Sequence, residues 1–442
     1  MNNFKKSDSG LKPEILKSVR DIHNPEILFK EFDLPNNLHC ILHNDSRIPV
    51  VNLFVAYDVG SKDEEPGKKG IAHLFEHLMF QGSENIKKNE HFGHILKSGG
   101  TCNAFTMQDA TVYFDFMPSC NLDKALWLES DRMNSLDLTE ENLENQKNVV
   151  IDAIKQRFEN TPYGSLLPLV FENVFKGSNY ESFTIGETED IRSFTVKEAV
   201  DFHRKYYSPG NAVLVLSGDF NPENAEAKIR KYFSGIQKEN HITRKVNNIS
   251  EIKEDADITV YDNVQLPLLC IAWQIPGSGS EEDYRMEYFS EILANNKSSR
   301  LYRKLVYEQK LLKSVNADKI VLKDAGILLI QAELFPDSDI ETAKKEIFKE
   351  INEIAVNGFT DYEFETIKNQ IEFENTAKYL KLFHVSLNAV FNYLYFKNIS
   401  RINDEINKYL SVSKEDVVRS VNEYIINKKR ISFLYLPNNF KK

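Results

Sequence analysis

The sequence predicts an α+β fold of two homologous domains, each with a mixed, largely antiparallel sheet packed with helices. Strand-like and helical runs occur in clusters, without the regular alternation that a parallel sheet requires. The same order of runs occurs twice. Three paired features also recur at offsets of 215 to 218 residues: 288–293 after 73–78, the capping box 413–416 after 195–198, and Tyr424 after Tyr206. We therefore expect a duplicated chain, with domains at 1–240 and 258–442 joined by a polar linker at 241–257.

The elements of the first half follow from local patterns. Two apolar runs flank the turn Pro35-Asn36-Asn37, which is a hairpin signal. The later segments are apolar runs, some strand-like and some helical, separated by polar turns. We expect strands at 28–33, 38–42, 50–60, 110–117 and 211–219, and helices at 73–80, 121–135, 140–159 and 195–207.

The second half repeats this order. We expect strands at 266–273, 326–334 and 430–436, and helices at 284–295 and from 361 to about 396. The end of the last helix, 383–396, is apolar on more than one face, which is typical of a helix buried between domains.

Composition excludes several classes of protein. The 442 residues hold 55 Lys and Arg against 66 Asp and Glu, a net charge of −11, which does not suit a nucleic-acid binder. No apolar run approaches the length of a membrane span, and the polar first residues lack a signal sequence. We expect a cytoplasmic protein, with the periplasm possible if a signal was removed. The four scattered cysteines favour reduced thiols, neither a disulfide framework nor a zinc cluster.

The strongest chemical motif is His73-Leu-Phe-Glu76-His77. On a helix the two imidazoles lie one turn apart and can reach one ion, with the carboxyl of Glu76 beside them. Neutral imidazoles suit Zn²⁺, and a neighbouring carboxylate can move a proton from water to a leaving amine. Such a triplet also occurs by chance on solvated helices. The apolar surroundings, 71–80, favour burial and hence a metal-type site.

This motif, H-x-x-E-H, and its flanking sequence resemble the M16 (pitrilysin-like, insulinase-type) metallopeptidases, and the length resembles the M16B type. The resemblance rests on segments 70–83, 99–106, 126–133, 145–150, 160–163, 206–211 and 218–220. It implies two homologous domains facing one another around a chamber, and a homo- or heterodimer. It also implies that His73 and His77 bind Zn²⁺ and that Glu76 is the general base. An edge strand at 100–106 would take up peptide through Asn103, Ala104 and Phe105.

The third zinc ligand of that family, a glutamate, aligns with Ala153, which has no ligand atom. Asp152 points about 100° away on the same helix, and Gln156 and Glu159 are not convincing substitutes. In the second half, Val306 and Lys313 stand where family members that act alone carry an Arg and a Tyr, which a partner subunit would then supply.

The sequence therefore predicts a zinc-dependent metalloendopeptidase that cleaves extended peptides or leader segments with a second M16 subunit, with one metal site per chain. Two alternatives stay open. The chain is a silent substrate-binding or scaffold subunit that has decayed at Ala153, or Ala153 was introduced to silence an active enzyme. A second histidine pair, His91 and His94, is expected on a solvated turn because Gly93 and polar residues surround it.

Overall fold

The structure, a computed structural model, describes residues 26–237, 242, 244 and 246–440, except the side chain of Glu159. The strands form two sheets. The first has the order β1-β2-β6-β3-β5-β4, and the second the order β7-β11-β8-β10-β9. The strands are β1 Lys30–Asp33, β2 His39–Asn44, β3 Val50–Tyr57, β4 Thr101–Thr106, β5 Thr111–Pro118, β6 Ala212–Gly218, β7 Ala256–Asp262, β8 Leu268–Pro276, β9 Leu312–Val321, β10 Ala325–Leu334 and β11 Arg430–Pro437.

The second sheet repeats the strand order of the first. In each sheet one parallel pair, β2–β6 or β7–β11, is followed by three antiparallel neighbours. The predicted α+β fold of two similar domains is therefore confirmed. The domain boundaries stay a prediction. Residues 241, 243 and 245 of the expected linker lie outside the described residues, and β7 already begins at Ala256.

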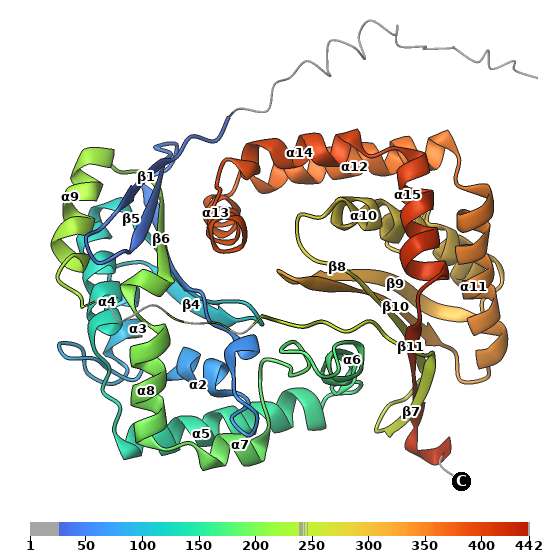
Figure 1. Ribbon diagram of the computed structural model, residues 1–442, viewed down its shortest axis with the longest axis horizontal. Coiled ribbons are helices and arrows are strands. Elements are labelled where there is room, and N and C mark those ends of the chain that lie inside the picture. The colour runs from blue at the N-terminus through green and yellow to red at the C-terminus, as the bar shows by residue number, and fades with distance from the viewer. Residues whose placement is uncertain (1–25, 238–241, 243, 245, 441–442) are drawn as a thin grey trace, which may run out of the picture.

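Helices cover both sheets (Figure 1). Those of the first half are α2 Ile71–Leu78, α3 Glu90–Lys97, α4 Leu122–Asn134, α5 Glu140–Ile154, α6 Leu166–Val174, α7 Thr188–Ser193, α8 Val196–Tyr206 and α9 Pro222–Phe233. Those of the second half are α10 Glu281–Leu293, α11 Ile340–Asn357, α12 Asp361–Lys378, α13 Leu382–Phe396, α14 Arg401–Ser411 and α15 Lys414–Val421. The capping boxes that begin α8 and α15 are both formed, as the sequence predicted.

One helix of each half packs against the sheet of the other half. From the first half, α6 packs Val170 and Phe171 against strands of the second sheet. From the second half, α13 packs Ala389 and Val390 against the first sheet. The two helices begin 216 residues apart, so the exchange follows the duplication. The expected burial of 383–396 between the halves is confirmed, and these contacts hold the halves together as one body.

Two local predictions are wrong. The long helix from 361 is two helices, because the chain turns at 379–381 so that α13 reaches the first sheet. His91 and His94 lie on α3, and His91 is only 3% exposed, with its ring edge-on to Phe80. Gly93 did not force a turn, because it lies on the open side of the helix, where nothing approaches within 4 Å.

No helix in the described part of the chain is both long and apolar enough to cross a bilayer.

Candidate active site

The H-x-x-E-H turn forms helix α2, which the fold holds firmly. Ile71, Leu74 and Leu78 are buried on its apolar side. Its first turn is capped by Glu64, whose two carboxylate oxygens accept the backbone N–H groups of Gly70 and Ala72 at 2.9 and 3.0 Å. Burial raises the pKa of Glu64 to about 8 although these two hydrogen bonds oppose the rise, and its ionised form complements the helix dipole. The apolar side thus fixes the rotation of α2, and with it the direction in which His73, Glu76 and His77 point.

His73 and His77 lie together as predicted. Their ring centroids are 5.0 Å apart and the rings are nearly perpendicular. Burial lowers the pKa of His73 to about 3, helped by His77 and Arg157, and lowers the pKa of His77. Both imidazoles are therefore neutral at pH 7, the form that binds a metal ion. Nδ1 of His73 is buried with no hydrogen-bond partner among the described residues, so a polar or cationic partner there would lower its free energy.

Glu76 connects α2 to the edge strand. The hydroxyl of Thr106 on β4 donates to Oε2 of Glu76 at 2.6 Å. Burial raises the pKa of Glu76, although the hydroxyl and backbone N–H of Thr106 and the charge of Arg157 oppose this rise. A half-buried carboxyl with a raised pKa is suited to accept and release a proton near neutral pH.

Helix α5, where the third zinc ligand was expected, packs beside α2. Ala153 is half-buried there, and the neighbouring Asp152 and Gln156 are exposed. Among the described residues this turn does not bring three His, Cys, Asp or Glu ligand atoms within 4.8 Å of one another. The residues present therefore fit two of the three protein ligands of a catalytic zinc site, and two imidazoles alone would bind such an ion weakly.

Strand β4 lies at the edge of the first sheet, as the resemblance implied. In the turn to β5, Met107 N–H donates to the oxygen of Ala110 at 2.8 Å. Because hydrogen-bonded pairs alternate along an antiparallel ladder, the backbone groups of Ala104 and Thr106 point to the open edge. Ala104 N–H donates a hydrogen bond to Oδ1 of the neighbouring Asn103 at 2.9 Å. Thr106 N–H is bonded to the carboxyl of Glu76. The edge beside Glu76 thus presents its outward carbonyls to an added strand, and an added strand would take over the Ala104 N–H from Asn103.

Of the three residues expected to contact peptide, Asn103 and Ala104 lie at this edge. The side chain of Phe105 points to the opposite face of the sheet, where it packs beside Phe114 and helix α13. By the same alternation the backbone groups of Phe105 face β5, so neither its side chain nor its backbone points to the open edge.

The second half carries no comparable turn among its described residues. Glu291 on α10, in the place of the H-x-x-E-H motif, accepts hydrogen bonds from Asn295 and Gln370. Lys313 is exposed on β9 and pairs with Glu333 at 3.2 Å, and Val306 is half-buried. The described residues of the chain therefore contain one H-x-x-E-H centre.

Four contributors were missed by sequence reasoning: Glu64, Thr106, Gln146 and Arg157. Gln146 on α5 hydrogen bonds to His77, and Arg157 lies close enough for its charge to lower the pKa values of the site. Glu64 could have been found as an acidic residue near the start of a short helix that lacks a Ser, Thr, Asp or Asn cap. The other three depend on contacts between distant segments, for which one sequence gives no signal.

The neutral imidazoles make stability depend on pH in a predictable direction. The pKa of His73 falls from 6.5 in the unfolded chain to about 3 in the folded chain. The contribution of the neutral His73 to the free energy of unfolding is therefore complete above pH 6.5, and it is lost as the pH falls toward 3. We expect the free energy of unfolding to drop by about 2 kcal/mol more in the wild type than in His73→Gln between pH 7 and 4.5. Urea titrations in the presence of a chelator measure this, and equal losses in both proteins would contradict it.

Comparison with known proteins gives a consistent result. Residues 39–188 match the family "Insulinase (Peptidase family M16)", and residues 193–371 match "Peptidase M16 inactive domain". The chain is 29% identical over 389 residues to the zinc protease PqqE of Helicobacter pylori, covering 86% of each chain. The crystal structure of a protease from Helicobacter pylori is similar, with a TM-score of 0.87 and 27% identity over 93% of this chain and all of that one.

A structure titled as a peptidase M16 inactive domain, from Pseudomonas fluorescens, shares the fold with a TM-score of 0.84 at 16% identity, covering 93% of this chain and 98% of that one. The matched segments include all strands of the two sheets except β1 and β11, and they include helix α2 with its two histidines and glutamate. The chain belongs to peptidase family M16.

Proposed function

We propose that the protein is a metalloendopeptidase of the M16B type that cleaves extended peptides held along β4. The supporting observation is the open edge of β4, which lies directly against the acid of the H-x-x-E-H turn through the Thr106–Glu76 hydrogen bond of 2.6 Å. An extended peptide that pairs with this edge would bring its backbone carbonyls beside Glu76, His73 and His77. Recognition by backbone pairing favours extended chains over any particular sequence.

Each residue then has a distinct role. His73 and His77 would hold Zn²⁺, which when bound polarises a peptide carbonyl as a Lewis acid. Glu76 takes a proton from the attacking water and returns it to the leaving amine. Thr106 orients the carboxyl of Glu76. Burial raises the pKa of Glu76 toward the range in which it can both accept and release a proton. The side chain of Asn103 accepts a hydrogen bond from the Ala104 N–H, and a carbonyl of the added peptide would take its place.

We further propose that the active form is a dimer with a second M16 subunit. This chain carries Val306 and Lys313 where an Arg and a Tyr would approach the substrate, so the partner supplies that pair. The cytoplasm is the proposed compartment.

A second candidate function is a peptide-binding subunit without catalysis. Ala153 favours it, since no described carboxylate replaces the missing ligand, and the positive charge of Arg157 near both imidazoles opposes a bound cation. The β4 edge would still take up peptide, for delivery to a partner.

Incubation of the purified full chain with Zn²⁺ and an unstructured peptide distinguishes these functions. The assay is run alone and after coexpression with an M16 homologue that carries the Arg–Tyr pair, and products are identified by mass spectrometry. Chelator-sensitive cleavage supports the peptidase. Peptide binding without cleavage in both arms supports the silent subunit, and absence of binding contradicts both.

Replacing Ala104 by proline tests the edge itself. Proline is tolerated on an edge strand where its nitrogen faces outward, but it removes the donor that an added strand needs. Because one backbone hydrogen bond contributes about 1 kcal/mol, we expect peptide affinity to fall at least about 5-fold. Fluorescence anisotropy with a labelled peptide measures this. Ala104→Gly, which keeps the N–H, is the matched control, and equal affinities of the two variants would exclude pairing at β4.

A further inference from the structure

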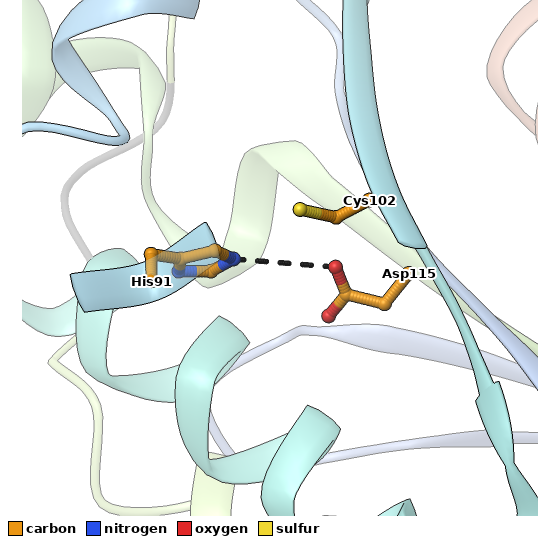
Figure 2. A group of neighbouring side chains, drawn as sticks. All are labelled: His91, Cys102 and Asp115. Carbon is orange, nitrogen blue, oxygen red and sulfur yellow. Dashed lines mark ion pairs between the residues drawn. The ribbon is translucent and has the colours of Figure 1, made fainter. Parts of the chain in front are cut away.

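A second cluster of metal-binding side chains lies behind the same edge strand. His91 on α3, Cys102 on β4 and Asp115 on β5 point toward one another (Figure 2), and one ligand atom from each lies within 4.8 Å of the others. Cys102 is four residues from Thr106 on the same face of β4, which separates this cluster from Glu76 by about 13 Å along the strand. The cluster shares no residue with the H-x-x-E-H turn.

Two polar side chains of this cluster are buried. His91 is 3% exposed and Asp115 is 1% exposed. Nε2 of His91 is buried with no hydrogen-bond partner among the described residues. The buried carboxyl of Asp115 lies beside that of Glu129, to which it can hydrogen bond only when one of the two is protonated. Native proteins rarely leave a buried polar atom unsatisfied or bury two carboxyls side by side, because each costs free energy. The unpartnered imidazole nitrogen and the adjoining carboxyls therefore favour a cationic ligand at this point.

The geometry suits a metal ion better than a direct contact. His91 Nε2 and Asp115 Oδ1 are 4.0 Å apart, too far for a hydrogen bond. Two ligands at about 2.0–2.3 Å from one tetrahedral ion lie roughly 3.3–3.8 Å apart, so a small contraction closes the site. Cys102 and Asp115 face each other across the β4–β5 ladder at a position without backbone hydrogen bonds, where side chains are closest.

The surrounding charges also balance with a divalent ion. Arg132 pairs with Glu129 through its Nε at 2.9 Å, and both side chains are buried. This pair is neutral overall, so it does not oppose a cation beside it. A divalent cation bound by one thiolate and one carboxylate adds no net charge to the interior, because its binding releases one proton from Cys102 and one from Asp115.

We propose that His91, Cys102 and Asp115 form a binding site for Zn²⁺ or a similar borderline-soft divalent cation. Nitrogen, sulfur and oxygen donors in this combination favour zinc over calcium or magnesium. Three protein ligands leave one position for water. The ion cross-links α3 with β4 and β5 and so holds the edge strand whose far end, Thr106, contacts Glu76. This site does not depend on the proposed peptidase function.

Titration of the full chain with Co²⁺ tests this proposal. A cobalt–thiolate bond gives a near-ultraviolet charge-transfer band, and the H-x-x-E-H turn contains no cysteine to produce one. The protein is stripped with a chelator and carries His73→Ala and His77→Ala, so that the other centre does not bind. We expect one equivalent of Co²⁺ and a band that Zn²⁺ displaces.

Three variants decide the outcome. Cys102→Ser should abolish the band, and His91→Gln or Asp115→Asn should weaken Co²⁺ binding at least 10-fold. Cys120→Ser is the matched control, since Cys120 is an exposed free cysteine, and it should change nothing. Circular dichroism confirms that each variant is folded. The proposal is overturned if the parent gives no band, or if the band survives Cys102→Ser or is lost in Cys120→Ser.

Discussion

Replacing Ala153 by glutamate is expected to raise the zinc affinity of the H-x-x-E-H centre by at least about 100-fold. Deleting even an outer partner of a metal ligand commonly changes affinity 10- to 100-fold, and this substitution adds a direct anionic ligand. Helix α5 already packs beside α2, and Ala153 is half-buried on it. The new carboxylate also offsets the positive charge of Arg157, which lowers the pKa of both imidazoles.

Competition with a zinc-binding dye at pH 7.5 measures this effect. The measurement is made in a Cys102→Ser background, so that the second cluster does not contribute. Ala153→Gln provides the control of similar size without charge, and should gain little. If Ala153→Glu binds zinc no more tightly than Ala153→Gln, then α5 does not present residue 153 to the two histidines, and the assigned centre is wrong.

Replacing Glu76 by glutamine is expected to lower kcat/KM for peptide hydrolysis by about 10²- to 10⁴-fold, the usual contribution of a general base. Glutamine can still accept the Thr106 hydroxyl, so the strand and the helix stay in place while the proton acceptor is lost. Cleavage of a quenched fluorescent peptide measures the change. The parent is the wild type, or Ala153→Glu if the wild type is inactive.

Glu65→Gln is the matched control, because Glu65 is an exposed glutamate outside the site, and it should leave the rate unchanged. A Glu76→Gln variant that cleaves as fast as its parent would remove Glu76 from the chemistry and show that another group moves the proton.

Local sequence patterns predicted much of this molecule. Apolar runs predicted β3, β5 and β8, and the capping boxes at Thr195 and Ser413 predicted the starts of α8 and α15, because these signals act within a few residues. The spacing of His73, Glu76 and His77 placed them on one helix for the same reason. The repeated order of strands predicted that the two sheets are alike.

Features that depend on distant contacts could not be predicted. Nothing near Leu166 or Leu382 indicates that α6 and α13 exchange sheets, although the apolar surface of α13 indicated burial. His91 was assigned to a solvated turn from its neighbours Gly93 and Glu90, and the fold instead turns it inward onto Phe80. Its approach to Cys102 and Asp115 results from three elements meeting, which a single sequence does not show.

The most direct test of the account is a crystal structure of the Glu76→Gln variant with a bound unstructured peptide. We expect the peptide as an added strand on β4, hydrogen bonded to the outward backbone of Ala104, with one carbonyl beside His73 and His77. A peptide bound elsewhere on the protein, with the β4 edge free, would contradict the account.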